Sequence, residues 1–262
     1  SRMRSNRGIL ELLVHDHRRG ETMTGAAPDA RLGLYGAPNS PFSLRVSLAA
    51  RAKGVQLNAL PIPAGGLRSS EFLAINPAAK IPVLFTEGHL AICESAVILE
   101  YLEDRFPQPS LLPFGADDRA FMRTIVAMTD RYFMAPVIRL FPQLNRSMRD
   151  DTVCRGEIAR WRAGMGYLSQ LLARPFAPVE AEVSMVECVL APSFHLGTRI
   201  AALLELEADP IFEFPVLEDF YSRMARKPFI FDALKDMTLN QDKKDSLSGL
   251  KSVHAFHTIF SV

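Results

Sequence analysis

Three short stretches of the chain, residues 40–43, 76–82 and 94–95, carry side chains whose types and order suit the binding of a small polar ligand. The first offers the hydroxyl of Ser40, the second a backbone edge at Ile81-Pro82, and the third the polar pair Glu94-Ser95. A hydroxyl, a free backbone edge and a carboxylate at a helix start can hold a short peptide that carries a thiol and two carboxylates. Each stretch alone indicates little, but the ordered set predicts a ligand pocket.

Ser40 stands where an expected strand ends and an expected helix begins. A hydroxyl there can donate a hydrogen bond to an anion, and the free amides of a helix start favour negative charge. Serine is also a common N-cap, and taken alone this is the better interpretation. The sequence shows no Gly-x-Ser-x-Gly elbow and no His and carboxylate partners, so Ser40 is not expected to be a hydrolase nucleophile. If it acts, it donates to the nucleophile of a ligand, and Ser43, one helical turn further on, is an alternative donor.

Two further features leave alternatives open. Pro82 begins an expected strand, and a cis bond would turn the Ile81 backbone outward to pair with an extended ligand, although trans is the commoner state of X-Pro bonds. Glu94-Ser95 is either a capping pair or a site in which Glu94 meets an ammonium group while Ser95 and the helix amides meet a carboxylate. Cys93 is the only thiol expected near this pocket, and we expect it to be a buried structural residue.

Composition excludes several classes of protein. The 262 residues are 48% hydrophobic and 23% charged with a formal charge of +1, so neither nucleic acid nor an anionic membrane is an expected partner. No apolar run approaches the ~20 residues that span a bilayer. The 3 cysteines and 6 histidines show neither a disulfide framework nor metal-ligand spacing. A cytoplasmic, reducing location without a bound metal is expected.

The first part of the chain, residues 31–107, predicts an α/β domain. Strands are expected at 32–36, 55–62, 81–85 and 89–92, and helices from Phe42 onward, at 69–73 and at 95–105. The order β-α-β-α-β-β-α is that of a thioredoxin-like domain, one sheet with helices on both faces. On the first helix Arg45, Arg51 and Lys53 are expected to face solvent.

The rest of the chain predicts helices. After a proline-rich linker, an all-helical domain is expected over residues 114–236, with long helices at 117–146, 151–173, 184–204 and 211–226. Ser184 and Glu187 have the spacing of a capping box, and His195 and Trp161 are expected to be packing residues. Residues 1–30 are expected to be a flexible extension and residues 237–262 a tail without an assigned role.

These residues resemble those of the cytosolic glutathione transferases, most closely the serine-type, tau-like classes. Residues 40–46 resemble the opening of that family, residues 76–84 its stretch around a cis proline, and residues 92–102 its glutamate-serine element. The capping box resembles the one in its helical domain, where aspartate more often stands at the position of Glu187. The likeness extends from residue 31 to residue 236.

The resemblance implies a thioredoxin-like glutathione-binding domain followed by an α-helical domain, usually in a homodimer, with glutathione as co-substrate and no metal. It implies that Ser40 hydrogen-bonds the glutathione sulfur and that the Ile81 backbone, beside Pro82, pairs with the cysteinyl part. Glu94 and Ser95 would hold the γ-glutamyl end, and Lys80 would reach the glycine carboxylate. A hydrophobic electrophile of unassigned identity would bind against the helical domain, in a pocket around Tyr132, Phe133 and Trp161.

The leading hypothesis is therefore an enzyme, a glutathione S-transferase that stabilises the glutathione thiolate for attack on an electrophilic small molecule. Related classes carry cysteine at the position of Ser40, and serine favours conjugation, isomerisation or peroxide reduction over thiol exchange. The alternative from another class is a non-catalytic regulator of the stringent-starvation type, which keeps this fold and binds RNA polymerase or another protein. A glutathione-dependent lyase, isomerase or dehalogenase is a third hypothesis.

Overall fold

The computed structural model describes residues 32–88 and 90–247, so the predicted N-terminal extension and most of the predicted tail lie outside the described residues. Its one mixed sheet has the strand order β2-β1-β3-β4. Strands β1 and β2 are parallel, whereas β3 pairs antiparallel with both β1 and β4. The strands are β1 (Leu32–Tyr35), β2 (Leu57–Leu60), β3 (Val83–Phe85) and β4 (Ala91–Cys93).

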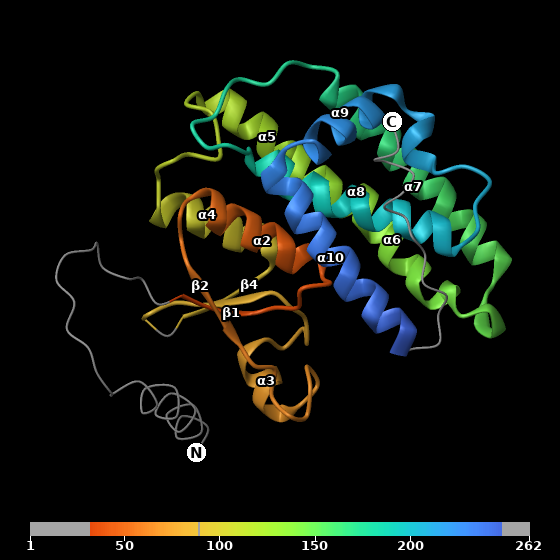
Figure 1. Cartoon of the computed structure of the whole chain (residues 1–262), viewed down its shortest axis with the longest axis horizontal. Coiled ribbons are helices and arrows are strands. Elements are labelled where there is room, and N and C mark those ends of the chain that lie inside the picture. Colours follow the sequence, from red (N-terminus) through yellow and green to blue (C-terminus); the bar gives the residue numbers. More distant parts are fainter. Residues whose placement is uncertain (1–31, 89, 248–262) are drawn as a thin grey trace.

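Three helices cover the two faces of this sheet (Figure 1). They are α2 (Pro41–Ala52), α3 (Ser70–Ile75) and α4 (Ser95–Arg105). Helices α2 and α4 contact each other on one face. On the opposite face Phe72 of α3 is fully buried against Tyr35 and Val83. The predicted thioredoxin-like order is confirmed, including the short hairpin between β3 and β4.

The remainder of the described chain is helical, as predicted, and it surrounds the outer side of α2 and α4 (Figure 1). The predicted Ser184–Glu187 capping box is present, with both reciprocal hydrogen bonds. The last helix continues past Asp236, where the predicted helical domain ends, and it buries Met237 and Gln241. The elements are α5 (Ala116–Met128), the π-helix η1 (Thr129–Met134), α6 (Ala135–Leu140), the 3-10 helices η2 (Phe141–Leu144) and η3 (Arg146–Met148), α7 (Asp151–Leu172), α8 (Met185–Leu203), the 3-10 helix η4 (Pro210–Glu213), α9 (Pro215–Ala225) and α10 (Pro228–Leu247).

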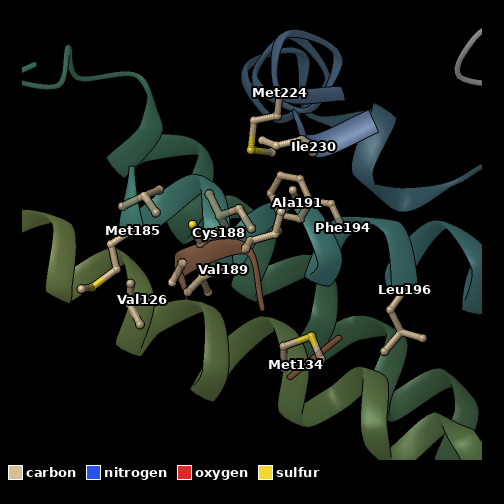
Figure 2. Packing of buried hydrophobic residues seen from close by; sticks show 14 of the residues in the cluster. Val126, Met134, Met185, Cys188, Val189, Ala191, Phe194, Leu196, Met224 and Ile230 are labelled. Atoms are coloured by element: carbon tan, nitrogen blue, oxygen red, sulfur yellow. The ribbon is translucent and has the colours of Figure 1, made fainter. Parts of the chain in front are cut away.

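Helix α8 is the centre of the molecule. Each of its residues from Cys188 to Ala201 is buried, because α2, α5, η1, α9 and α10 all contact it. Figure 2 shows Val189 and Phe194 of α8 between Met134 on one side and Ile230 on the other. A helix in such a central position is expected to be mainly apolar, and its buried polar residues Ser193, His195 and Arg199 have hydrogen-bond or ion-pair partners. The packing of α8 on α2 joins the two parts of the chain into one core. None of the helices in the described part of the chain is long and apolar enough to cross a membrane.

The expected solvent exposure of two basic residues on α2 is wrong. Arg45 is 0% exposed and Lys53 is 6% exposed, whereas Arg51 is exposed as predicted. The physical reason is that α8 and the linker after α4 cover the side of α2 that faces away from the sheet. Lys53 Nζ donates to the backbone oxygens of Phe106 and Pro109 at 2.8 and 3.0 Å, and it lies 2.6 Å from the Glu103 carboxylate. Buried charges persist only when they are paired in this way.

Candidate functional site

A cavity of about 560 Å³ lies between the thioredoxin-like domain and the helical region. This volume is within the range of small-molecule binding sites. All three polar stretches recognised in the sequence reach this cavity, although they come from three different loops. The six predicted site residues that line it are Ser40, Lys80, Ile81, Pro82, Glu94 and Ser95.

Ser40 is the N-cap of α2 and also lines the cavity. Its backbone is extended (φ −93°, ψ 123°) where the loop after β1 enters α2, and its Oγ accepts a hydrogen bond from the amide of Ser43 at 3.3 Å. Accepting that bond leaves the hydroxyl proton of Ser40 free to be donated. The alternative donor, Ser43, is buried and does not line the cavity, and its Oγ accepts from the Ala37 amide at 3.1 Å. The capping and ligand-donor interpretations of Ser40 are therefore compatible.

The Ile81-Pro82 peptide bond is cis, as the resemblance implied. The loop before it is held by Asn76, whose side chain donates to the Lys80 carbonyl at 2.8 Å and accepts from the Ala78 amide at 3.0 Å. Pro82 is buried and Lys80 is exposed, and both residues line the cavity. The backbone of this loop thus forms one rim of the cavity.

Glu94 and Ser95 differ in their surroundings. Glu94 occupies the N-cap position of α4 with φ 67°, and its exposed side chain makes no capping hydrogen bond. A non-glycine residue in this left-handed region is uncommon and is found where the surrounding structure fixes it. Ser95 is 5% exposed, and its Oγ accepts from Arg45 Nη1 at 3.5 Å. The capping interpretation of the Glu94 side chain therefore has no support in this geometry.

Arg45 is a residue of the site that sequence reasoning missed. Its guanidinium contacts Ser95, the Asp130 carboxylate at 2.5 Å and the Ser193 hydroxyl at 2.8 Å. Burial lowers the pKa of Arg45, and the charge of Asp130 opposes this shift. Arg45 does not line the cavity, but its contact with the Ser95 hydroxyl brings a buried guanidinium next to a residue that does. The start of α4 favours an anionic group near Ser95, while the charge of Arg45 is already paired with Asp130.

The predicted electrophile pocket around Tyr132, Phe133 and Trp161 is wrong in its location. Phe133 and Trp161 are fully buried and pack edge-to-face with ring centroids 5.6 Å apart. Tyr132 packs in the same manner against Tyr167. Other residues form the helical wall of the cavity. Its apolar members are Ile138, Phe141, Leu144, Leu196, Ile200 and Leu203, from α6, η2 and α8.

Two other residues considered in the sequence stay outside the cavity lining. Cys93 is half-buried, and burial raises the pKa of its thiol, with a smaller contribution from Glu94. His195 is 2% exposed and contacts Thr238 Oγ1 at 2.7 Å and Tyr221 Oη at 3.4 Å. The prediction that His195 and Trp161 are packing residues is confirmed.

Comparisons with known proteins agree with this fold. A family model described as the N-terminal domain of glutathione S-transferase matches residues 34–110. A maleylacetoacetate isomerase of Pseudomonas aeruginosa is 30% identical over 182 residues, which are 66% of this chain and 84% of the relative. A stringent starvation protein A homolog of Coxiella burnetii is 34% identical over 173 residues, 64% of this chain and 78% of the relative. The structure of Ure2p in complex with glutathione has a TM-score of 0.65 at 19% identity and covers 80% of this chain and 95% of its own.

The chain belongs to the glutathione S-transferase family. Its relatives carry names of transferases, isomerases and stringent starvation proteins, so membership defines the fold and the class of protein.

Proposed function

We propose that this protein is a glutathione transferase, in which Ser40 stabilises the thiolate of bound glutathione for attack on an electrophilic small molecule. The observation that carries the proposal is the shared cavity. Ser40, the cis Ile81-Pro82 bond and Glu94-Ser95 line one side, and an apolar wall of the helical region lines the other. A polar side for a peptide and an apolar side for a second molecule are what a two-substrate transfer requires.

Each polar residue has a role that its surroundings support. The free hydroxyl proton of Ser40, beside the amides of α2, would be donated to the sulfur. The backbone of Ile81 would pair with the cysteinyl unit, and the exposed Lys80 would meet the glycine carboxylate. Glu94 would hold the γ-glutamyl ammonium group, while Ser95, with Arg45 behind it, would hold the adjacent carboxylate.

The chemical step needs few groups. A free thiol has a pKa of about 8.5, and a hydrogen-bond donor beside a helix start favours the thiolate over the thiol. The thiol proton leaves to solvent, and the sulfur forms a bond to the electrophilic carbon. The displaced electron pair departs with a leaving group or moves onto a conjugated carbonyl oxygen. Positioning of both molecules in one cavity supplies the remaining rate enhancement.

The test combines a calorimetric titration with glutathione and an ultraviolet pH titration of the bound thiol. We expect binding, a lowered thiol pKa, and loss of that lowering in Ser40→Ala. Removing one donor that stabilises an anion should also reduce turnover by roughly 10²–10³-fold. An unchanged thiol pKa in Ser40→Ala would move the role to Ser43 or to backbone amides. No binding at millimolar glutathione would rule out the transferase.

A second candidate is a non-catalytic regulator on the same fold, which is supported by the likeness to a stringent starvation protein A homolog over 78% of that relative. Such a protein would bind RNA polymerase or another protein partner. The glutathione titration separates the two proposals, because a non-catalytic regulator does not need to lower the pKa of the glutathione thiol. We therefore expect a lowered thiol pKa in the wild type only if the protein is a transferase. Under either proposal the protein would be cytoplasmic and a homodimer, and sedimentation of the purified chain tests the dimer.

A further inference from the structure

The side chain of Asn76 holds the loop that leads to Ile81, and both ends of its amide are used. Its Nδ2 donates to the Lys80 carbonyl oxygen at 2.8 Å, and its Oδ1 accepts from the Ala78 amide at 3.0 Å. These partners settle which way the amide points, because a carbonyl oxygen only accepts and a backbone N–H only donates. Asn76 is 3% exposed, so water has little access to either hydrogen bond.

The backbone of Asn76 is itself fixed by the fold. Asn76 is the C-cap of α3, and its N–H donates to the Phe72 carbonyl oxygen at 2.8 Å. Phe72 is fully buried against Tyr35 of β1 and Val83 of β3. A side chain that is held by hydrogen bonds on an anchored element positions its partner closely. The Lys80 carbonyl is therefore tied through Asn76 to the core on this face of the sheet.

The direction of the Lys80 carbonyl determines where the Ile81 amide points. The peptide bond between these two residues is trans and planar, so its C=O and its N–H point in opposite directions. Because Asn76 binds the C=O, the Ile81 N–H points away from the Asn76 amide group. In the described part of the chain, neither the N–H nor the C=O of Ile81 has a hydrogen-bond partner. Buried backbone groups are nearly always paired, and Ile81 is half-buried and lines the cavity, so these two groups have their partner to find in the cavity.

We infer that Asn76 is a positioning residue for glutathione, which fixes the plane of the Lys80–Ile81 peptide so that the Ile81 N–H meets a carbonyl oxygen of the cysteinyl unit. This inference rests on the proposed glutathione transferase. Asn76 acts through the backbone of the loop and not through a bond of its own to the ligand. A backbone amide that is already oriented loses no freedom on binding, so it contributes more affinity than a mobile one.

Hydrogen exchange of the backbone amides in the ¹⁵N-labelled full chain tests the state of Ile81 without any variant. In the free protein the Ile81 N–H should exchange rapidly, and saturating glutathione should slow it roughly tenfold, as a new hydrogen bond would. The Ala78 N–H is the internal control, because Asn76 Oδ1 binds it and should protect it with and without glutathione. An Ile81 N–H that is slow in the free protein, or that stays fast with glutathione bound, would overturn the inference.

Asn76→Asp tests the hydrogen bond to Lys80. The substitution keeps an oxygen that accepts from Ala78, but at neutral pH its other oxygen cannot donate and is repelled by the Lys80 carbonyl. The Kd for glutathione should rise roughly tenfold, and glutathione at saturation should slow the Ile81 exchange less than in the wild type. The thiol pKa of the bound glutathione should stay at its wild-type value, because Ser40 is untouched.

Asn58→Asp is the matched control, because it makes the same change of charge on an exposed residue of β2 outside the cavity lining. It should bind glutathione as the wild type does. An unchanged Kd in Asn76→Asp contradicts the inference, and so does a thiol pKa that changes together with the Kd, since that result indicates a general disturbance of the site. Should Asn76→Asp fail to fold, the exchange data of the wild type decide alone. If the wild type binds no glutathione, the proposed function itself fails, whereas binding without protection of Ile81 overturns only this inference.

Discussion

Arg45 and Asp130 form an ion pair across the boundary between the two parts of the chain, with 2.5 Å between Nη1 and Oδ1. The pair joins α2 of the thioredoxin-like domain to η1 of the helical region. Its two members are unequal, since the Arg45 side chain is 0% exposed and the Asp130 side chain is 33% exposed. The carboxylate retains contact with water, whereas the guanidinium depends on its protein partners.

This inequality predicts an asymmetric effect of substitution. Asp130→Ala leaves a buried guanidinium without its counter-charge and should lower the free energy of unfolding by about 3–5 kcal/mol. Arg45→Met leaves a carboxylate that water can still reach, so we expect a clearly smaller loss. Urea denaturation of both variants measures the difference. A larger loss in Arg45→Met would mean that the contacts of Arg45 with Ser95 and Ser193 dominate over the ion pair.

Glu94 should affect ligand binding more than stability. Its side chain is exposed and makes no capping hydrogen bond, so Glu94→Gln removes no contact that holds the described fold. Loss of a charge-assisted hydrogen bond to the γ-glutamyl ammonium group should raise the KM for glutathione roughly tenfold. Steady-state kinetics and thermal unfolding measure the two effects. Asp104→Asn is the control, because Asp104 is an exposed acid within α4 that lies outside the cavity lining. A loss of stability with an unchanged KM would return Glu94 to the capping interpretation.

The sheet and its helices were predictable because local signals agreed with the fold. Ser40 and Ser69 cap their helices by accepting from backbone amides, and the Ser184–Glu187 box opens α8. The polar half of the cavity was predictable for the same reason. Its residues sit at strand ends and helix starts, where sequence patterns are most informative.

The helical half was not predictable in the same way. Periodicity assigns a charged residue such as Arg45 to solvent, and its partners Asp130 and Ser193 are 85 and 148 residues away in the chain. Phe133 and Trp161 mark buried surface, but sequence alone does not say whether an aromatic residue faces the core or a cavity. Gln241 and Asn39, which are in contact, are 202 residues apart in the chain, and no local sequence pattern predicts this contact.

Buried His195 should make stability depend on pH. Burial, and secondly the charge of Arg199, lowers its pKa from 6.5 to about 4, while Asp242 opposes the shift. Between these values the unfolded chain binds a proton at this residue and the folded chain does not, so unfolding becomes easier as the pH falls. The contribution lost between pH 6.5 and pH 4 is about 3 kcal/mol. Thr238 and Tyr221, which face the ring, are neutral in this range.

His195→Gln tests this dependence, with urea denaturation of variant and wild type at each pH. The difference between the two profiles should change over this window and be constant above pH 7. Taking the difference between the two profiles cancels the contributions of other titrating groups. The main one is Asp209, whose pKa burial raises to about 6, so that it makes the protein more stable as the pH falls. A pH-independent difference would show that His195 is already protonated or exposed at pH 6.5.

Two glycines of α7 should respond in opposite directions to alanine. A Cβ at Gly164 would overlap the carbonyl oxygen of Tyr132 in η1 and lie 2.6 Å from its carbonyl carbon, so backbone would have to move. A Cβ at Gly156 would meet only the end of the flexible Arg160 side chain, at 3.8 Å. Both positions lie within one helix, where alanine is intrinsically favoured over glycine by about 0.5–1 kcal/mol.

Gly164→Ala should therefore lower the free energy of unfolding by about 1–3 kcal/mol, the cost of overpacking a well-packed contact, whereas Gly156→Ala should raise it slightly. Because η1 also carries Asp130, displacement of Tyr132 should disturb the ion pair with Arg45 and weaken glutathione binding in Gly164→Ala only. Urea denaturation and a glutathione titration of both variants measure these effects. Equal stability of the two variants would mean that η1 can shift without cost, and that its position is not what fixes Arg45 behind Ser95.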